Sequence, residues 1–188
     1  RWGGARGRKN PQKLQAFSGY NGLLAWETTL ESGGGHSLIS DDDYIFLVDG
    51  QNLKAINVHT GKTLWKRCPD ECRKDMTHWT IFAYQDNVLA AGVNNGKAVR
   101  MKQVYAFNPA DGKKVWEFSL PAPADSMCIG KGTVFISCTK HSLIALDIKT
   151  GTAVWTKDKI FGFLRFWPLK EWIICGKSAF HAKDGTLA

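Results

Sequence analysis

A short motif recurs along the chain at intervals of about 40 residues, and this period constrains the fold more than any other feature. Each copy holds an alanine, a polar turn residue, a glycine and, four residues after that glycine, a tryptophan. The four complete copies contain these pairs: Gly22 with Trp26, Gly61 with Trp65, Gly112 with Trp116, and Gly151 with Trp155. A fifth copy begins at Ala179 and reaches Gly185. A constant period predicts a repeat architecture, since an ordinary β-sandwich lacks one.

Each copy is typical of a β-hairpin whose turn is closed by the glycine, because glycine adopts the positive φ that such turns require. Asn57, Asn108 and Asp147 precede three of these turns, and their side chains are expected to accept hydrogen bonds from the turn amides. Further apolar strands are expected ahead of the hairpins at 44–48, 88–92 and 134–138, each preceded by a short strand at 36–39, 80–83 and 126–129. Four antiparallel strands per unit indicate the blades of a β-propeller.

The middle unit is longer than the others, since Trp65 and Trp116 are 51 residues apart while the other tryptophans are spaced by 39. Seven of the extra residues are expected in a loop at 93–102, and five around Cys68 and Cys72. These two cysteines could form a local disulfide or remain an exposed thiol pair. A zinc site there lacks a fourth ligand and the usual spacing.

The motif resembles the propeller repeat of the pyrroloquinoline quinone (PQQ) type, found in quinoprotein dehydrogenases and in many non-catalytic relatives. The resemblance covers residues 16–188 and implies an all-β fold, a β-propeller of PQQ-like four-stranded antiparallel blades. It also implies that Trp26, Trp65, Trp116 and Trp155 dock each blade on its neighbour, beside the turn glycines. The complete units are 31–67, 68–118 and 119–157, with partial units at 16–30 and 158–188 and a basic, glycine-containing arm at 1–15.

The number of units leaves the closure of the ring open. Propellers of this family usually close with about six to eight blades, and the chain holds four to five blades' worth of repeats. A partial propeller is favoured because the last motif stops one residue before its tryptophan position. The alternative is a four-bladed ring in which the two partial units form one blade.

The net charge of +8 is concentrated at one end of the chain. Residues 1–13 contain no acid and contribute five bases: Arg1, Arg6, Arg8, Lys9 and Lys13. The remaining residues are nearly balanced, which argues against a nucleic-acid groove. The arm is interpreted as a solvated tail, with contact to an acidic surface as the alternative. No apolar run approaches the ~20 residues of a membrane-spanning helix, so no transmembrane segment is expected.

Two further segments are candidate contacts for a protein partner. The segment 161–172 is rich in aromatic residues, and the candidates there are Phe161, Phe163, Arg165, Phe166 and Trp167. The alternative interpretation places this segment in the core between blades. The insertion 93–102 offers Lys97, Arg100 and Lys102, because insertions in repeat proteins gather on binding faces. His59 and His181 are interpreted as surface residues near the turns, and Cys128, Cys138 and Cys175 as small buried apolar residues.

The sequence identifies no catalytic, cofactor-binding or metal-binding residue, and it lacks the adjacent Cys-Cys pair of catalytic quinoproteins. The favoured function is a non-enzymatic scaffold that binds protein partners, or further blades of the same chain, within a larger assembly. A piece of a PQQ-dependent dehydrogenase, with PQQ and calcium as cofactors, is the first alternative. A lumenal sensor domain that binds peptides is the second. The resemblance also implies an extracytoplasmic location.

Overall fold

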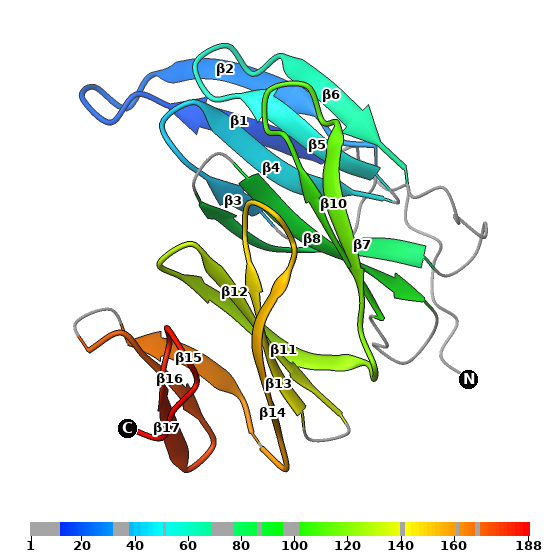
Figure 1. Cartoon of the computed structure of the whole chain (residues 1–188). Coiled ribbons are helices and arrows are strands. Elements are labelled where there is room, and N and C mark those ends of the chain that lie inside the picture. Colours follow the sequence, from blue (N-terminus) through cyan, green and yellow to red (C-terminus); the bar gives the residue numbers. More distant parts are fainter. Residues whose placement is uncertain are drawn as a thin grey trace, which may run out of the picture.

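The computed structural model describes residues 12–31, 38–50, 52–68, 77–85, 88–95, 102–139, 142–160, 162–167 and 170–188, with backbone only for 77–85 and 88–95. The regular elements of these residues are all β-strands, grouped in five antiparallel sheets that follow one another in chain order (Figure 1). The all-β prediction is therefore confirmed for the part of the chain that the structure describes. No helix in this part has the length and apolarity of a membrane span.

Each sheet is built from consecutive strands. The first sheet has two strands, β1 (Lys13–Phe17) and β2 (Leu24–Thr29). The second contains β3 (Leu38–Ser40), β4 (Tyr44–Asp49), β5 (Asn52–Asn57) and β6 (Thr63–Arg67). The third contains β7 (Thr77–Gln85), β8 (Val88–Asn95), β9 (Gln103–Phe107) and β10 (Lys114–Ser119). The fourth contains β11 (Ala124–Gly130), β12 (Thr133–Cys138), β13 (Ser142–Asp147) and β14 (Ala153–Asp158), and the last β15 (Leu164–Trp167), β16 (Trp172–Cys175) and β17 (Ser178–His181).

The hydrophobic core lies in the seams between the faces of consecutive sheets. Strands such as β4 and β12 are buried along most of their length, because a sheet covers each of their two faces. Phe46 packs toward the third sheet with Trp65 and Phe107, whereas Leu47 packs toward the first sheet. Alternate residues of one strand therefore enter two different seams, as the period of two in a strand requires. This stacking of sheets face to face is the packing expected of propeller blades.

Two predicted boundaries are wrong. The insertion was expected to form a loop from 93 to 102, but Val93–Asn95 continue β8 and pair with the start of β7. The insertion thus lengthens a hairpin before it becomes a connection. The basic arm was expected to extend to residue 15, but β1 begins at Lys13, because Leu14 packs into the first seam and Lys13 forms an ion pair with Glu27.

Candidate functional site

In each of the first four sheets, one tryptophan binds that sheet to the next one along the chain. Trp26, Trp65, Trp116 and Trp155 lie on the last strands of the first four sheets, and each indole nitrogen donates a hydrogen bond to a backbone oxygen of the following sheet's hairpin turn. The acceptors are, in order, the oxygens of Val58 at 2.7 Å, Pro109 at 2.6 Å, Ile148 at 2.7 Å and Ala182 at 2.9 Å. The same contact therefore recurs at all four seams.

The turn glycines are required at these seams for space as well as for conformation. Gly112 has a φ of 66°, and a Cβ placed on it would lie 2.6 Å from the ring of Trp65. Gly61, Gly151 and Gly185 meet the preceding tryptophan in the same way, at 2.5–2.8 Å. Gly22 has a φ of 70° but nothing within 4 Å of its hypothetical Cβ. The sequence predicts the turn conformation of these glycines, and the close approach of a ring appears only once the sheets are stacked.

A β-bulge next to each tryptophan turns its side chain toward the following sheet. The pairing register shifts next to all four tryptophans, which leaves the residue before each one out of the ladder. The bulged residues are Ala25, Leu64, Val115 and Val154, and the last three are about half exposed. A bulge twists a strand and redirects the following side chain. The repeat in the sequence contains these positions, but periodicity alone does not reveal an unpaired residue.

Side-chain oxygens stiffen the hairpin turns as the sequence predicts. The Asn57 Oδ1 atom accepts hydrogen bonds from the amides of His59 and Thr60, at 3.1 and 2.9 Å. Asp147 accepts equivalent bonds at 2.9 and 2.8 Å from the two amides that follow Ile148, and the bond from the Thr150 amide is the main reason that its pKa lies below the usual value. The seams and turns together make a rigid support rather than a reactive centre.

The last sheet presents a different kind of face on the side away from the fourth sheet. Trp167, Trp172 and His181 lie directly opposite one another on β15, β16 and β17, so they form one row across this face. The rings of Trp172 and His181 meet edge to face, with centroids 6.3 Å apart. Arg165 and Ile174 form the neighbouring row. We call this surface the outward face; no strand of the described residues packs against it.

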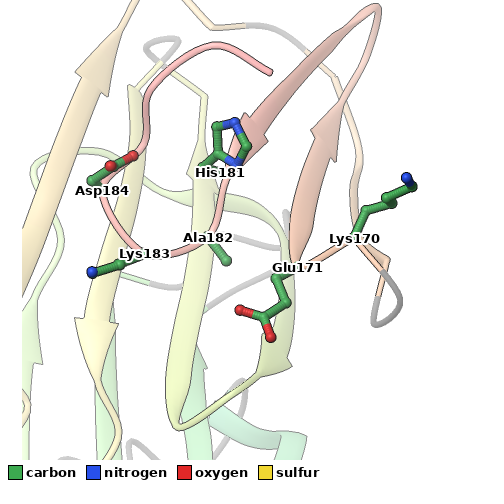
Figure 2. Close-up of a pocket in the computed structure, with 6 residues that line it drawn as sticks. All are labelled: Lys170, Glu171, His181, Ala182, Lys183 and Asp184. Carbon is green, nitrogen blue, oxygen red and sulfur yellow. The ribbon is translucent and has the colours of Figure 1, made fainter.

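An open hollow of about 400 Å³ adjoins the end of this row (Figure 2). It is lined by Lys170, Glu171, His181, Ala182, Lys183 and Asp184. Figure 2 shows Lys170 and Lys183 on opposite sides of His181. The Lys170 ammonium lies 5.9 Å from the centre of the Trp172 ring, within the range of a cation–π contact. The hollow thus combines two cations with one end of an aromatic row.

Both acids at the hollow already have partners. Glu171 forms an ion pair with Lys131 at 3.1 Å. Asp184 accepts hydrogen bonds from the hydroxyl and the amide of Thr186, at 2.7 and 2.9 Å, and these bonds lower the pKa of Asp184. The ion pairs found among the described residues do not include Arg165, Lys170 or Lys183. The Asp184 charge offsets part of this positive charge, because it acts on Lys183 and His181; the charge of Lys170 and Arg165 is available to a ligand.

The candidate contacts of segment 161–172 separate into two groups. Arg165 and Trp167 lie on the outward face, where Trp167 is 48% exposed, and Phe163 is 78% exposed just before β15. Phe166 instead faces the fourth sheet, stacks on Phe135 and lies against Gly130, so it supports the sheet. Alternate residues of this segment therefore lie in the core and on the surface, and contact of the surface residues with a partner stays a prediction.

Trp172 and His181 complete the row but were not singled out as contacts by the sequence. The alternation of buried and partly exposed residues in β16 and β17 is the signal that could have found them. Lys102 is exposed next to β9. The other candidates lie outside the described residues: Arg1, Arg6, Arg8, Lys9, Lys97, Arg100, Phe161 and Cys72.

The cysteines contribute packing. Cys138 and Cys175 are buried, and Cys128 packs in the seam between the last two sheets. Burial raises the pKa of the Cys128 thiol to about 12, so it stays protonated and unreactive at neutral pH. Cys68 is exposed, and its pairing with Cys72 stays a prediction. The described residues contain no group of three or more His, Cys, Asp or Glu side chains suited to hold a metal ion.

Comparison with known proteins identifies the architecture. A family model described as the outer membrane protein assembly factor BamB matches residues 8–101 and 52–166. No curated protein matches the chain. Among solved structures, BamB from Moraxella catarrhalis is 14% identical with a TM-score of 0.63, and the match covers 93% of this chain and 56% of that protein.

Two enzymes are also similar in structure. A europium-containing methanol dehydrogenase is 11% identical with a TM-score of 0.59, over 80% of this chain and 40% of the enzyme. The quinohemoprotein alcohol dehydrogenase ADHIIG from Pseudomonas putida HK5 is 12% identical with a TM-score of 0.60, over 80% of this chain and 33% of the enzyme. The chain thus spans between a third and somewhat over half of these proteins. At such identities the likeness shows the fold alone, and the predicted PQQ-like propeller blades are confirmed.

Proposed function

Because the chain belongs to the PQQ-type repeat family of the outer membrane protein assembly factor BamB, we propose that it is a non-enzymatic propeller scaffold that binds protein partners within a larger assembly. The repeated tryptophan seams supply a rigid support, and rigidity lowers the entropy cost of presenting a binding surface. Further blades of the same chain are the alternative partner for the outward face.

The observation that carries this proposal is the outward face of the last sheet. It exposes Trp167 beside Trp172 and His181, with Arg165 in the next row. Tryptophan and arginine dominate the binding energy of protein interfaces, because they combine a large contact area with directional polar groups. A row of large rings on an open sheet face is the arrangement expected of a docking surface.

A capture experiment tests the scaffold proposal. The full chain, immobilised and exposed to extract from its own source, should retain a defined protein partner, and Trp167→Ala should lose it. Val154→Ala is the matched control, because Val154 is also about half exposed but lies on β14, which is not part of the outward face. Equal capture by both variants, or no partner at all, would count against the proposal. Circular dichroism would establish that each variant is folded.

A piece of a quinoprotein dehydrogenase is the second candidate, favoured by the structural likeness to the two alcohol-oxidising enzymes. That function requires PQQ, which accepts electrons from the substrate, and a divalent cation such as calcium to hold and polarise it. The described residues contain no cluster of three or more acidic, His or Cys side chains. No catalytic step is assigned to this chain.

Cofactor loading separates the two candidates. The purified full chain would be mixed with PQQ and calcium, freed of unbound cofactor, and assayed for dye reduction with a primary alcohol. Retained cofactor absorbance together with turnover would replace the scaffold proposal by the dehydrogenase one. Neither signal is expected for a scaffold.

We also propose an extracytoplasmic location, in keeping with the description of the family as an outer membrane assembly factor. A reporter that fluoresces only inside the cytoplasm, fused to the full-length gene product, should remain dark. A bright fusion would contradict this location.

A further inference from the structure

We propose that the outward face of the last sheet binds an extended acidic peptide of the partner, in which carboxylates and large apolar side chains alternate along one face, at every second residue. This inference rests on the proposed scaffold function and names the chemistry of the partner. It combines three features of the sheet β15–β17: its aromatic row, its available cations and its strand geometry.

The aromatic row offers a surface for apolar side chains. Trp167, Trp172 and His181 continue across all three strands, and the Trp172 and His181 rings already meet at 6.3 Å. The strands that carry the row are held in place, because Ile173 and Phe180 on the other face of the sheet are buried in the seam with the fourth sheet. A fixed backbone lowers the ordering cost when a ligand binds, which favours affinity.

The charge around the row selects for an acidic ligand. Residues 159–188 carry two acids and five bases, which are Lys159, Arg165, Lys170, Lys177 and Lys183. Glu171 is paired with Lys131, whereas the Asp184 charge acts on Lys183 and His181 and offsets part of the positive charge. Lys170 and Lys183 flank His181 at the hollow, as Figure 2 shows. Cations on both sides of this end of the row complement a peptide with acids two residues before and two residues after an apolar residue.

The geometry favours an extended peptide. Trp167 and Arg165 are alternate residues of β15, and alternate residues of a strand are about 6.5–7 Å apart on one face. An extended ligand peptide has the same spacing between its own alternate side chains. One residue of such a peptide would contact the rings while an acidic neighbour on the same face contacts Arg165.

The first sheet provides an internal contrast, because the charged groups on its outer face are already paired. There Gln15 and Lys13 both bond to the carboxylate of Glu27, at the equivalent end of the stack of sheets. The pKa of Glu27 is lowered by its bonds to Lys13 and Gln15, as expected for a carboxylate whose charge is matched. Phe17 on β1 is also exposed, so the difference between the two end sheets lies in the charge: the last sheet carries cations without an ion pair among the described residues.

A peptide-binding experiment on the full chain tests this inference. The probe, the Asp-Phe peptide, is a short synthetic peptide labelled with fluorescein that repeats Asp-Ser-Phe-Ser, so that Asp and Phe share one face of the extended chain. In the matched Lys-Phe peptide Lys replaces Asp, and in a second matched peptide Ser replaces Phe. Fluorescence anisotropy should detect binding of the Asp-Phe peptide alone, and added salt should weaken it, because exposed charges are screened.

Variants of the protein locate the binding site. Trp167→Ala and Lys170→Ala should each weaken binding of the Asp-Phe peptide by about tenfold, the loss typical of removing one aromatic or charged anchor. Trp167→Phe should recover most of the affinity. Lys149→Ala is the control, since Lys149 is an exposed lysine in the turn after β13, and it should bind like the wild type.

Several outcomes would overturn the inference. Equal binding of the Lys-Phe peptide, or unchanged affinity in both the Trp167 and Lys170 variants, would refute the proposed chemistry. Binding of heparin or anionic vesicles that depends on Lys170 but not on Trp167 would indicate a general anion site instead. If a captured partner is lost in Trp167→Ala yet is not displaced by the Asp-Phe peptide, the scaffold function stands and this inference falls. If the peptide binds as expected but no partner is captured, the scaffold proposal fails alone.

Discussion

Replacing Gly112 by Ala tests how one sheet is fastened to the next. Gly112 has a φ of 66°, and its hypothetical Cβ lies 2.6 Å from the Cδ2 atom of Trp65. Gly22 has nearly the same φ, 70°, but no atom within 4 Å of that position. Both substitutions impose the same left-handed backbone on Ala, and only the one at Gly112 displaces a tryptophan. The pair therefore separates conformational strain from the seam contact.

The expected magnitudes follow from these two contributions. Ala in the left-handed region costs about 1–2 kcal/mol, which is the whole expected effect of Gly22→Ala. At Gly112 the forced movement of the ring adds about 1–3 kcal/mol of overpacking. The bond from the Trp65 indole to the Pro109 oxygen, at 2.6 Å, is worth about 1 kcal/mol more. Gly112→Ala should therefore lower the free energy of unfolding by about 3–6 kcal/mol.

Urea unfolding followed by far-UV circular dichroism measures both effects without depending on tryptophan fluorescence. A double-mutant cycle makes the test sharper. In a Trp65→Ala background the ring is absent, so Gly112→Ala should cost only the backbone strain of about 1–2 kcal/mol. Additive effects of the Trp65 and Gly112 substitutions, or equal costs at Gly22 and Gly112, would refute the seam as the source of the glycine requirement.

Three further predictions concern other parts of the fold. Lys54→Ala removes the ammonium beside the fully buried Asp49 side chain and should lower the free energy of unfolding by about 3 kcal/mol. Lys66→Ala, at an exposed ion pair, should lower it by about 0.5 kcal/mol or less. Similar urea midpoints for these two variants would contradict this. The pKa of Asp147 is lowered in the folded state, so its contribution is present above the unfolded pKa near 4 and is lost as pH falls through the folded value. Asp147→Asn should therefore flatten the acid side of the stability curve, and an unchanged curve would exclude this carboxylate as a contributor. Gly162 has a φ of 121°, and a Cβ on it would lie 2.5 Å from the Cα atom of Gly176, just after β16. Gly162→Ala should therefore destabilise the last sheet by about 2–4 kcal/mol. Limited proteolysis should then cleave residues 159–188 faster than in the wild type. Wild-type resistance to the protease would argue that the backbone there shifts freely.

The buried ion pair of the second sheet shows why the first of these costs is large. Lys54 donates to Asp49 at 2.7 Å and to Glu31 at 2.9 Å, and the Glu31 amide donates to the same Asp49 oxygen at 2.8 Å. Burial lowers the pKa of Lys54, but these bonds outweigh that effect and raise it. The network joins the end of β2 to the second sheet, so its loss loosens the connection between two sheets.

The sequence alone determined the local structure of the repeats. Hairpin turns depend on residues a few positions apart, such as Asn57 with Gly61, and their preferences act through short-range backbone conformation and hydrogen bonds. The apolar runs in β4 and β12 likewise identify strands with both faces covered. The residues and their spacing therefore predicted the fold class, the number of complete four-stranded sheets and the four seam tryptophans.

Only the tertiary structure decided what lies on each side of the last sheet. Phe166 and Trp167 are neighbours in an aromatic segment, yet one stacks in the seam on Phe135 and the other lies on the outward face. The row with Trp172 and His181 depends on the pairing register of three strands, which composition does not specify. Packing one face of the sheet against its neighbour commits alternate side chains to the core, and the residues left on the other face become the surface that a partner can meet.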